Sequence, residues 1–237
     1  MKAVLLAAGL GTRLRPITLT TPKCLIPFEG IPLLEIWLRQ LESAGIEEAL
    51  INLHHLPDQV QQFVDQRKGI IEIHTAYEPN LLGSLGSLLY NSKFYQNEDS
   101  IFVGYADNLV SAVQEKLITD HSGHEFPVTM AVFETSEPEQ CGIVEVDERN
   151  VVRGFVEKPD KPTFNLANAG LYVIDTSILT EFETSGEELL DIGFHLLPKL
   201  INQMVAIKYD GYIQDVGNLE RYKGAQEYFR ERHDEFF

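Results

Sequence analysis

The 237-residue chain has few cysteines and no long hydrophobic run. Its two cysteines, Cys24 and Cys141, exclude a disulfide framework and lack the C-x-x-C spacing of a redox or zinc motif. No stretch approaches the roughly 18 consecutive apolar residues of a membrane span. The first apolar run is too short for a signal peptide and is broken after Gly9. We therefore expect a cytoplasmic protein with reduced thiols and no membrane contact.

Basic residues are also scarce. The chain has 19 Lys and Arg against 36 Asp and Glu, a net charge of −17, which argues against a nucleic-acid partner. The first 23 residues reverse this balance, since they hold four basic side chains, Arg13 and Lys23 among them, and no acidic one. Gly9 and Gly11 lie in the same stretch. A basic, glycine-bearing loop in an acidic protein predicts an anion-binding site.

This loop fits neither of two common phosphate-binding motifs. The G-x-G-x-x-G fingerprint would need glycine at position 14, where Leu14 stands, and no G-K-[ST] triplet occurs. Glycine still lets backbone N–H groups approach a polyphosphate, and the Arg13 guanidinium can bind two phosphate oxygens. An ordinary strand–turn with scattered basic residues is the structural alternative.

Apolar periodicity predicts alternating strands and helices. Strands are predicted at 3–8, 49–53, 70–76, 100–107, 127–134, 142–146, 204–208 and 211–214, and helices at 31–44, 58–67, 187–200 and 222–237. The early strand–helix–strand order favours an α/β protein with a parallel sheet, which binds ligands beyond the carboxyl ends of its strands. After Glu78, a loop with Gly83 and Gly86 leads into a further helix, whose first N–H groups are expected to be free for a ligand. A tight turn capped by Ser84 is the alternative.

The sequence LAAGLGTRLRPITLTTPK, residues 6–23, resembles the signature of the sugar-1-phosphate nucleotidyltransferases, or NDP-sugar pyrophosphorylases. The resemblance extends over essentially the whole chain. It implies a Rossmann-like, doubly wound α/β fold with a mostly parallel mixed sheet flanked by helices and a small sugar-binding lobe. It also implies that an NTP and a sugar 1-phosphate are joined with release of pyrophosphate, with Mg²⁺ as cofactor.

The resemblance assigns nucleotide binding to the first loop and to the loop after Glu78. The residues concerned are Ala7, Ala8, Gly9, Gly11, Thr12, Arg13, Lys23, Leu82 and Gly83. Catalytic roles are implied for Arg13, Lys23, Asp107 and Asp215, with Asp107 and Asp215 as the Mg²⁺ ligands. Ala106 replaces the glycine that usually precedes the first aspartate, and Ser84 and Leu85 depart from the usual L-G-T-A-G-A. From the residues alone, the favoured interpretation of Asp215 is that it caps the last helix.

Sugar-phosphate binding is implied for four residues in three short motifs. Glu157 and Lys158 come from E-K-P, Asn168 from N-A-G and Gly142 from C-G-I-V. The resemblance suggests one catalytic domain over 1–237, with a nucleotide-binding part at about 1–125, a sugar-binding part at about 126–215 and a C-terminal helix at about 218–237. No C-terminal β-helix of hexapeptide repeats is expected. The sequence is compatible with a homo-oligomer as well as with a monomer.

Several substrates and activities stay open. GTP with a mannose- or heptose-type sugar 1-phosphate is favoured; a uridylyl- or thymidylyltransferase acting on an amino-sugar or muramic acid type is the alternative. A phosphocholine cytidylyltransferase is disfavoured because the sugar motifs are intact. A catalytically inactive regulatory or scaffold relative is the alternative from another class. The histidine pairs His54–His55 and His121/His124 could bind zinc, but no supporting ligands appear at suitable spacing.

Overall fold

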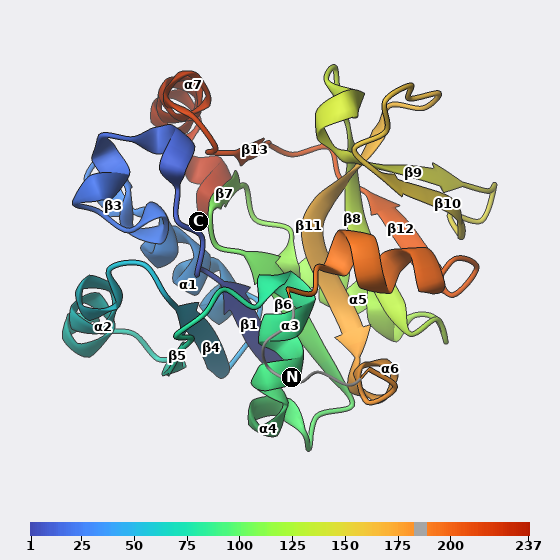
Figure 1. Cartoon of the computed structure of the whole chain (residues 1–237), viewed down its shortest axis with the longest axis horizontal. Helices are drawn as coiled ribbons and strands as arrows, with labels where there is room; N and C mark the ends of the chain where they lie inside the picture. The colour runs from blue at the N-terminus through green and yellow to red at the C-terminus, as the bar shows by residue number, and fades with distance from the viewer. Residues whose placement is uncertain (183–188) are drawn as a thin grey trace. The chain divides into compact units, whose positions relative to one another are not determined.

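The computed structural model describes residues 1–182 and 189–237. The chain divides into two compact units (Figure 1). The first unit comprises Met1–Leu81, Gly104–Glu115 and Gly211–Phe237, and the second comprises Leu82–Val103 and Lys116–Asp210. Strand β6 (Ser100–Tyr105) and helix α5 (Gln114–Ser122) carry the chain from one unit into the other.

The first unit contains three parallel strands, β1 (Lys2–Leu6), β4 (Glu48–Leu53) and β5 (Glu72–Tyr77). The apolar run that predicted β1 is buried, with Ala3, Val4 and Leu5 fully inaccessible. Burial of this run removes apolar surface from water, the main favourable term in folding. Strand β1 ends where the basic loop begins, so the parallel strands place that loop at their carboxyl edge.

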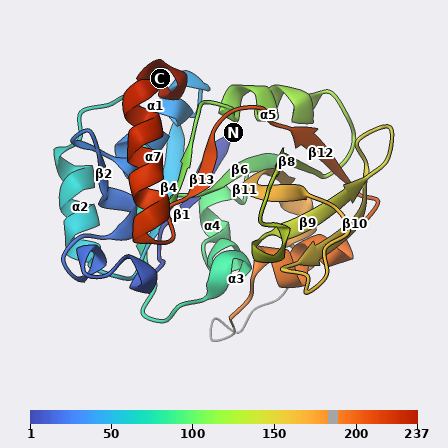
Figure 2. The same cartoon turned by 90° about the horizontal axis from the view of Figure 1, so that it is seen from above.

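Helices α1 (Leu33–Ser43), α2 (Pro57–Gln66) and α7 (Leu219–Glu231) belong to the same unit. The predicted first helix begins two residues later than expected. Ile31 and Pro32 instead form β3 (Ile31–Pro32), which pairs antiparallel with β2 (Pro27–Phe28). Tyr222 Oη donates to the carbonyl of Pro27, so α7 packs on β2 (Figure 2).

A second, two-stranded ladder in this unit joins β7 (Asn108–Val110) to β13 (Ile213–Asp215) in antiparallel register, with Asp215 opposite Asn108. The predicted strand at 211–214 is thus confirmed with a small shift. Helix α7 begins after Asn218, whose side chain accepts a hydrogen bond from the Arg221 backbone at 2.9 Å. The N-cap is therefore Asn218, and the capping role considered for Asp215 is wrong.

The second unit contains strands of mixed direction. They are β8 (Val128–Glu134), β9 (Gly142–Val146), β10 (Val152–Glu157), β11 (Leu166–Asp175) and β12 (Met204–Lys208). Strand β12 runs parallel to β8, while β11 pairs antiparallel with β8 and β9, and β9 with β10. Helices α3 (Gly83–Tyr90), α4 (Ser92–Tyr95) and α6 (Thr176–Leu179) also lie in this unit.

The predicted α/β class, with a mostly parallel mixed sheet flanked by helices, is confirmed. Two helix predictions need correction. The start of the helix predicted at 187–200 lies outside the described residues, and its described part is a π-helical turn, Ile192–Leu196, followed by a 3-10 turn, Leu197–Lys199. The helix predicted at 222–237 starts earlier, ends at Glu231 and is followed by a 3-10 turn, His233–Phe236. Among the described residues, no helix is long and apolar enough to cross a membrane.

Candidate functional site

The loop after β1 folds as three short 3-10 turns, Thr12–Leu14, Ile17–Leu19 and Lys23–Leu25. Gly11 has a φ of +60°, and a Cβ there would lie 2.8 Å from Cγ2 of Thr18. Thr18 is buried and its hydroxyl donates to the carbonyl of Gly11 at 2.7 Å. Glycine is therefore required at position 11 both by conformation and by space.

Lys23 ends this loop with its side chain only 6% exposed. Its ammonium nitrogen lies 2.6 Å from Oδ2 of Asp107 and 3.0 Å from Oδ1 of Asp215. Burial acts to lower the pKa of Lys23, but the two carboxylates outweigh burial, and the pKa is raised above its usual value. Lys23 therefore stays charged at neutral pH.

Strand pairing explains why the two aspartates meet. Asp107 immediately precedes β7 and Asp215 ends β13, and these two strands pair. The backbone N–H of Val216 also donates to the carbonyl of Asp107 at 3.3 Å. The carboxylates are therefore held near one another by backbone hydrogen bonds as well as by Lys23.

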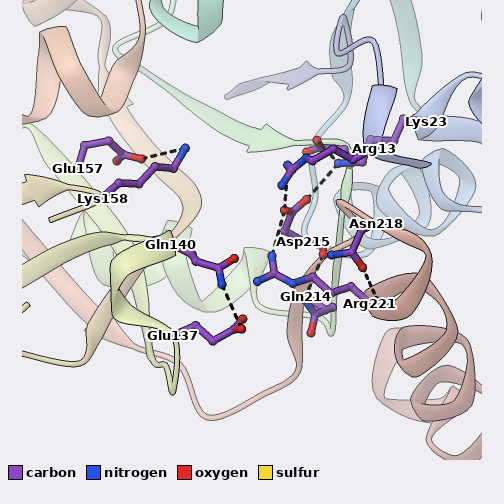
Figure 3. A network of polar contacts seen from close by, with 11 residues as sticks. Arg13, Lys23, Glu137, Gln140, Glu157, Lys158, Gln214, Asp215, Asn218 and Arg221 are labelled. Atoms are coloured by element: carbon purple, nitrogen blue, oxygen red, sulfur yellow. Dashed lines mark hydrogen bonds and ion pairs between the residues drawn. The ribbon is translucent and has the colours of Figure 1, made fainter. Parts of the chain in front are cut away.

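Two arginines face the other oxygen of Asp215 (Figure 3). Nη2 of Arg13 lies 3.9 Å and Nη1 of Arg221 lies 3.5 Å from Oδ2 of Asp215. Arg13 is 69% exposed and so accessible to a ligand, whereas Arg221 is 21% exposed. Arg221 was not among the site residues predicted from the sequence. Its position in the first turn after D-V-G-N is the signal that could have found it.

The chemistry of this cluster fits a divalent cation. Carboxylate oxygens of Asp107 and Asp215 already converge on one cation, the Lys23 ammonium. Among the described residues no group of three or more His, Cys, Asp or Glu side chains gathers around a metal-sized site. A hard cation such as Mg²⁺ binds one or two carboxylates together with water and phosphate oxygens, so two aspartates are a sufficient protein contribution.

The end of β1 is held by two buried polar side chains that the sequence argument did not assign. Asn52 is 2% exposed and Glu78 is fully buried. Oδ1 of Asn52 accepts from the backbone N–H of Ala7 at 2.6 Å, and its Nδ2 donates to Oε1 of Glu78 at 3.2 Å. The N–H of Ala7 is therefore engaged within the protein, and a nucleotide contact at this residue would have to use its carbonyl.

Leu82 and Gly83 lie at the start of α3, in the second unit. Gly83 has a φ of +76°, and a Cβ there would overlap the carbonyl oxygen of Leu190. The backbone N–H groups of Leu85 and Gly86 both donate to this carbonyl at 3.0 Å. The expectation that the first N–H groups of the helix are free for a ligand is therefore wrong for Leu85 and Gly86.

The predicted sugar-phosphate residues lie in the second unit. A Cβ at Gly142 would lie 2.6 Å from Oε2 of Glu157, so this glycine makes room for the glutamate. Nζ of Lys158 lies 3.9 Å from Oε1 of Glu157 and the lysine side chain is 61% exposed (Figure 3). Asn168 Nδ2 donates to the hydroxyl of Tyr172 at 2.6 Å.

Glu157 is the partly buried acid of this group, with 16% of its side chain exposed. Burial raises the pKa of Glu157, Lys158 partly opposes the rise and Asp191 adds to it. Burial likewise raises the pKa of the Tyr172 hydroxyl, which also feels the charges of Glu157 and Asp191. Gly142, Glu157, Lys158 and Asn168 are thus grouped around one polar centre, to which the structure adds Tyr172 and Asp191.

The histidine pairs do not form a zinc site in the described residues. Nδ1 of His54 contacts the carbonyl of Glu78 and Nε2 of His55 that of Thr18. His121 and His124 both contact the hydroxyl of Thr129, at 2.8 and 2.9 Å. All four rings are used in the hydrogen bonding of the protein itself.

Comparisons with known proteins identify the family of this chain. A family model described as Nucleotidyl transferase matches residues 2–232. The mannose-1-phosphate guanyltransferase of Gibberella zeae is 31% identical over 222 residues, which are 92% of this chain and 61% of that protein. The chain spans about 60% of the length of the first curated relatives it matches.

Two solved structures share the fold. A UDP-glucose pyrophosphorylase complexed with UDP-glucose has a TM-score of 0.84 at 22% identity, covering 98% of this chain and 99% of that one. HddC from Yersinia pseudotuberculosis complexed with GMP-PN has a TM-score of 0.79 at 22% identity, covering 96% and 99%. These likenesses confirm the Rossmann-like α/β fold. Since the family model spans nearly the whole chain and includes the loop that presents Lys23, the chain belongs to the nucleotidyl transferase family.

Proposed function

We propose that the chain joins a nucleoside triphosphate to a sugar 1-phosphate, giving an NDP-sugar and pyrophosphate, with GTP and a mannose- or heptose-type sugar 1-phosphate as substrates and Mg²⁺ as cofactor. One observation carries the proposal: Asp107 and Asp215 share one buried cation, Lys23, and the accessible Arg13 lies beside Asp215. Two acids and two cationic side chains at one place suit a metal-bound polyphosphate.

The reaction needs electrostatic stabilisation more than proton transfer. An oxygen of the sugar phosphate attacks the α-phosphorus of the NTP, a new P–O bond forms, and the bond from the α-phosphorus to the bridging oxygen breaks. Pyrophosphate leaves with that oxygen and its electron pair. Because the attacking phosphate is already ionised at neutral pH, no general base is required.

Each cationic residue has a distinct role in this proposal. Arg13 would bind the leaving β- and γ-phosphates, for which its planar guanidinium is suited. Lys23 would move from the aspartates to the transferring phosphate, and Lys158 would hold the sugar phosphate for in-line attack. Glu157 and Asn168 would bind sugar hydroxyls, with Gly142 leaving room for Glu157.

Asp107 and Asp215 would hold the metal through their carboxylate oxygens. When bound, Mg²⁺ supplies charge neutralisation of the phosphates and orientation of the α-phosphate. The remaining nucleotide contacts are proposed at Ala8, Gly9, Gly11 and Thr12, at the carbonyl of Ala7, and at Leu82 and Gly83. The same proposal includes the single catalytic domain predicted from the sequence, with its nucleotide-binding and sugar-binding parts. It also includes a cytoplasmic location, and it leaves the oligomeric state undefined.

The base and sugar are supported by the relatives. The Gibberella zeae protein is named for mannose 1-phosphate and guanylyl transfer, and the HddC structure was obtained with GMP-PN. The fold is shared equally with a UDP-glucose enzyme, so a uridylyl- or thymidylyltransferase on another sugar 1-phosphate is the second candidate. The inactive scaffold is disfavoured because every proposed charged residue is present.

Pyrophosphate release tests the proposal. The protein is mixed with Mg²⁺, one of five NTPs and a panel of sugar 1-phosphates, and pyrophosphate is followed by a coupled assay. We expect release with GTP and mannose 1-phosphate, and a kcat lowered by about 10²–10³-fold in Lys23→Ala, as for loss of one transition-state contact. Release with another pair would favour the second candidate. No pyrophosphate release with any pair would favour the catalytically inactive scaffold. Near-normal turnover of Lys23→Ala would contradict the catalytic role proposed for Lys23.

A further inference from the structure

The start of α3 is fastened to the segment Leu190–Gly193 by hydrogen bonds that none of the proposed roles uses. Ser84 is 8% exposed. Its hydroxyl donates to Oδ2 of Asp191 at 2.9 Å and accepts from the backbone N–H of Ile192 at 2.8 Å. The N–H of Leu190 donates to the carbonyl of Leu82 at 2.8 Å. We call this set of contacts the Ser84–Asp191 clamp.

Each end of the clamp reaches a residue with a proposed ligand role. At one end lies the Leu82–Gly83 turn, where the missing side chain of Gly83 admits the carbonyl of Leu190. At the other end, Oδ1 of Asp191 accepts from the N–H of Gly193 at 2.8 Å. A Cβ at Gly193 would lie 2.6 Å from Oε2 of Glu157, so the backbone at Gly193 forms a wall of the Glu157 site.

The two oxygens of Asp191 thus serve two different structures. Oδ1 caps its own helical turn, and Oδ2 bonds the serine of another helix. A displacement of the Leu82–Gly83 turn must move Leu190 and Asp191, and through Gly193 it must alter the space available to Glu157. By the same contacts, a displacement of Glu157 would move Gly193, Asp191 and the Leu82–Gly83 turn.

We propose that Ser84 and Asp191 are positioning residues that couple the nucleotide-contacting turn Leu82–Gly83 to the sugar-contacting carboxylate of Glu157, so that the two substrates strengthen each other's binding. The proposal rests on the proposed function, because it needs both ligands to bind. Coupling of this kind is reciprocal: each ligand must tighten the other by the same factor.

The experiment measures the coupling without turnover. The Kd of mannose 1-phosphate is determined by calorimetry with Mg²⁺, alone and with saturating α,β-methylene-GTP, and the ratio of the two Kd values is the coupling factor. We expect a factor of about 10 for the wild type and a factor within about twofold of unity for Ser84→Ala. Ser84→Thr, which keeps the hydroxyl, should retain most of the coupling.

A matched control separates coupling from general destabilisation. Ser111 is also buried, and its hydroxyl accepts from the backbone N–H of Tyr212 at 2.9 Å. Ser111→Ala therefore leaves a backbone N–H without this acceptor, as Ser84→Ala does for Ile192, and it should keep the wild-type factor. If Ser84→Ala fails to fold, Asp191→Ala replaces it, since it removes the carboxylate that accepts from Ser84 together with the acceptor of the Gly193 N–H.

Two results would overturn the proposal while the proposed function stands. In both cases the two probes bind the wild type. In the first, the coupling survives in Ser84→Ala and Asp191→Ala. In the second, Ser111→Ala loses the coupling to the same extent as Ser84→Ala. Failure of both probes to bind the wild type would instead refute the choice of substrates, and the coupling proposal with it.

Discussion

Asp107 and Asp215, far apart in the sequence, are joined by a single ammonium group, with Nζ of Lys23 at 2.6 and 3.0 Å from their carboxylates. Without the Lys23 ammonium, the pairing of β7 with β13 would bring the two negatively charged carboxylates together. Lys23 neutralises part of that repulsion. The ammonium thus lies where a metal ion bound by both carboxylates would also lie.

Removal of the Lys23 charge should strengthen metal binding to the nucleotide-free protein. In Lys23→Met the carboxylates of Asp107 and Asp215 lose their internal counter-ion, and Mn²⁺ no longer has to displace it. We expect Mn²⁺ to bind about 10-fold more tightly, which corresponds to about 1.4 kcal/mol, as measured by electron paramagnetic resonance of free Mn²⁺. Lys158→Met, which changes a lysine of the other unit, is the control. Equal affinity in wild type and Lys23→Met would show that the ammonium and the metal do not compete.

Arg221 should matter more for activity than its distance from the first loop suggests. Its guanidinium lies 3.5 Å from Oδ2 of Asp215 and restrains this carboxylate. We expect Arg221→Gln to lower kcat/KM by about 10-fold, which corresponds to about 1.4 kcal/mol. Arg230→Gln, on the same helix α7 but paired with Glu29 at 3.0 Å, should leave kcat/KM unchanged. A similar loss in both variants would point to the stability of α7 instead.

Glu157 should make stability depend on pH. Burial and Asp191 raise its pKa in the folded protein, against the opposing effect of Lys158, so the folded state holds this proton more tightly than the unfolded state. The stabilisation is fully present below the unfolded pKa of about 4.3 and is lost as pH rises through the folded pKa. Urea unfolding of Glu157→Gln should therefore show a smaller decrease in free energy of unfolding between pH 4 and pH 8 than the wild type. An identical decrease would show that Glu157 does not titrate abnormally.

His124 should have the opposite dependence on pH. Burial and the nearby His121 lower its pKa, partly opposed by Asp175 and Asp120, so the folded state favours the neutral ring. Its contribution to stability is present above the unfolded pKa of about 6.5 and is lost as pH falls toward the folded pKa. His124→Gln should reduce the loss of unfolding free energy between pH 7.5 and pH 5.5, while His233→Gln, an exposed histidine, should not.

The hydrogen bonds also fix the tautomers of this histidine pair. Nδ1 of His124 accepts from the N–H of Phe126 at 3.1 Å, so a neutral ring carries its proton on Nε2 and donates to Thr129. The Thr129 hydroxyl can then donate to Nδ1 of His121, leaving Nε2 of His121 to donate to Asp175 at 3.0 Å. Nitrogen-15 spectra at pH 8 should show both rings protonated on Nε2. A proton on Nδ1 of either ring would contradict this order.

Local patterns in the sequence predicted most elements, because burial periodicity and turn residues act within a few positions. The apolar run of β1 and the spacing of Leu34, Leu38 and Leu41 in α1 are examples. The convergence of Lys23 with Asp107 and Asp215 could be expected from the family resemblance but not from the residues, because it depends on the register of β13 against β7.

Other residues of the site are not marked by any local sequence pattern. Asp191 and Ser84 meet only through tertiary packing, and nothing in E-L-L-D-I-G marks an aspartate that bonds a distant serine. The expectation of free N–H groups at the start of α3 was wrong for Leu85 and Gly86 for the same reason, because both donate to the carbonyl of the distant Leu190. A helix start identifies donors, but only the folded chain shows which acceptor they meet.

The surroundings of Cys24 have a practical consequence for labelling. Burial raises the pKa of this thiol to about 12, so it stays protonated and unreactive at neutral pH although it adjoins Lys23. Cys141 is partly accessible, and its carbonyl accepts from the N–H of Lys158 at 3.0 Å. A maleimide fluorophore should therefore attach to Cys141 alone in the unaltered sequence, and a change in its emission on addition of a sugar 1-phosphate would test the binding role proposed for Lys158.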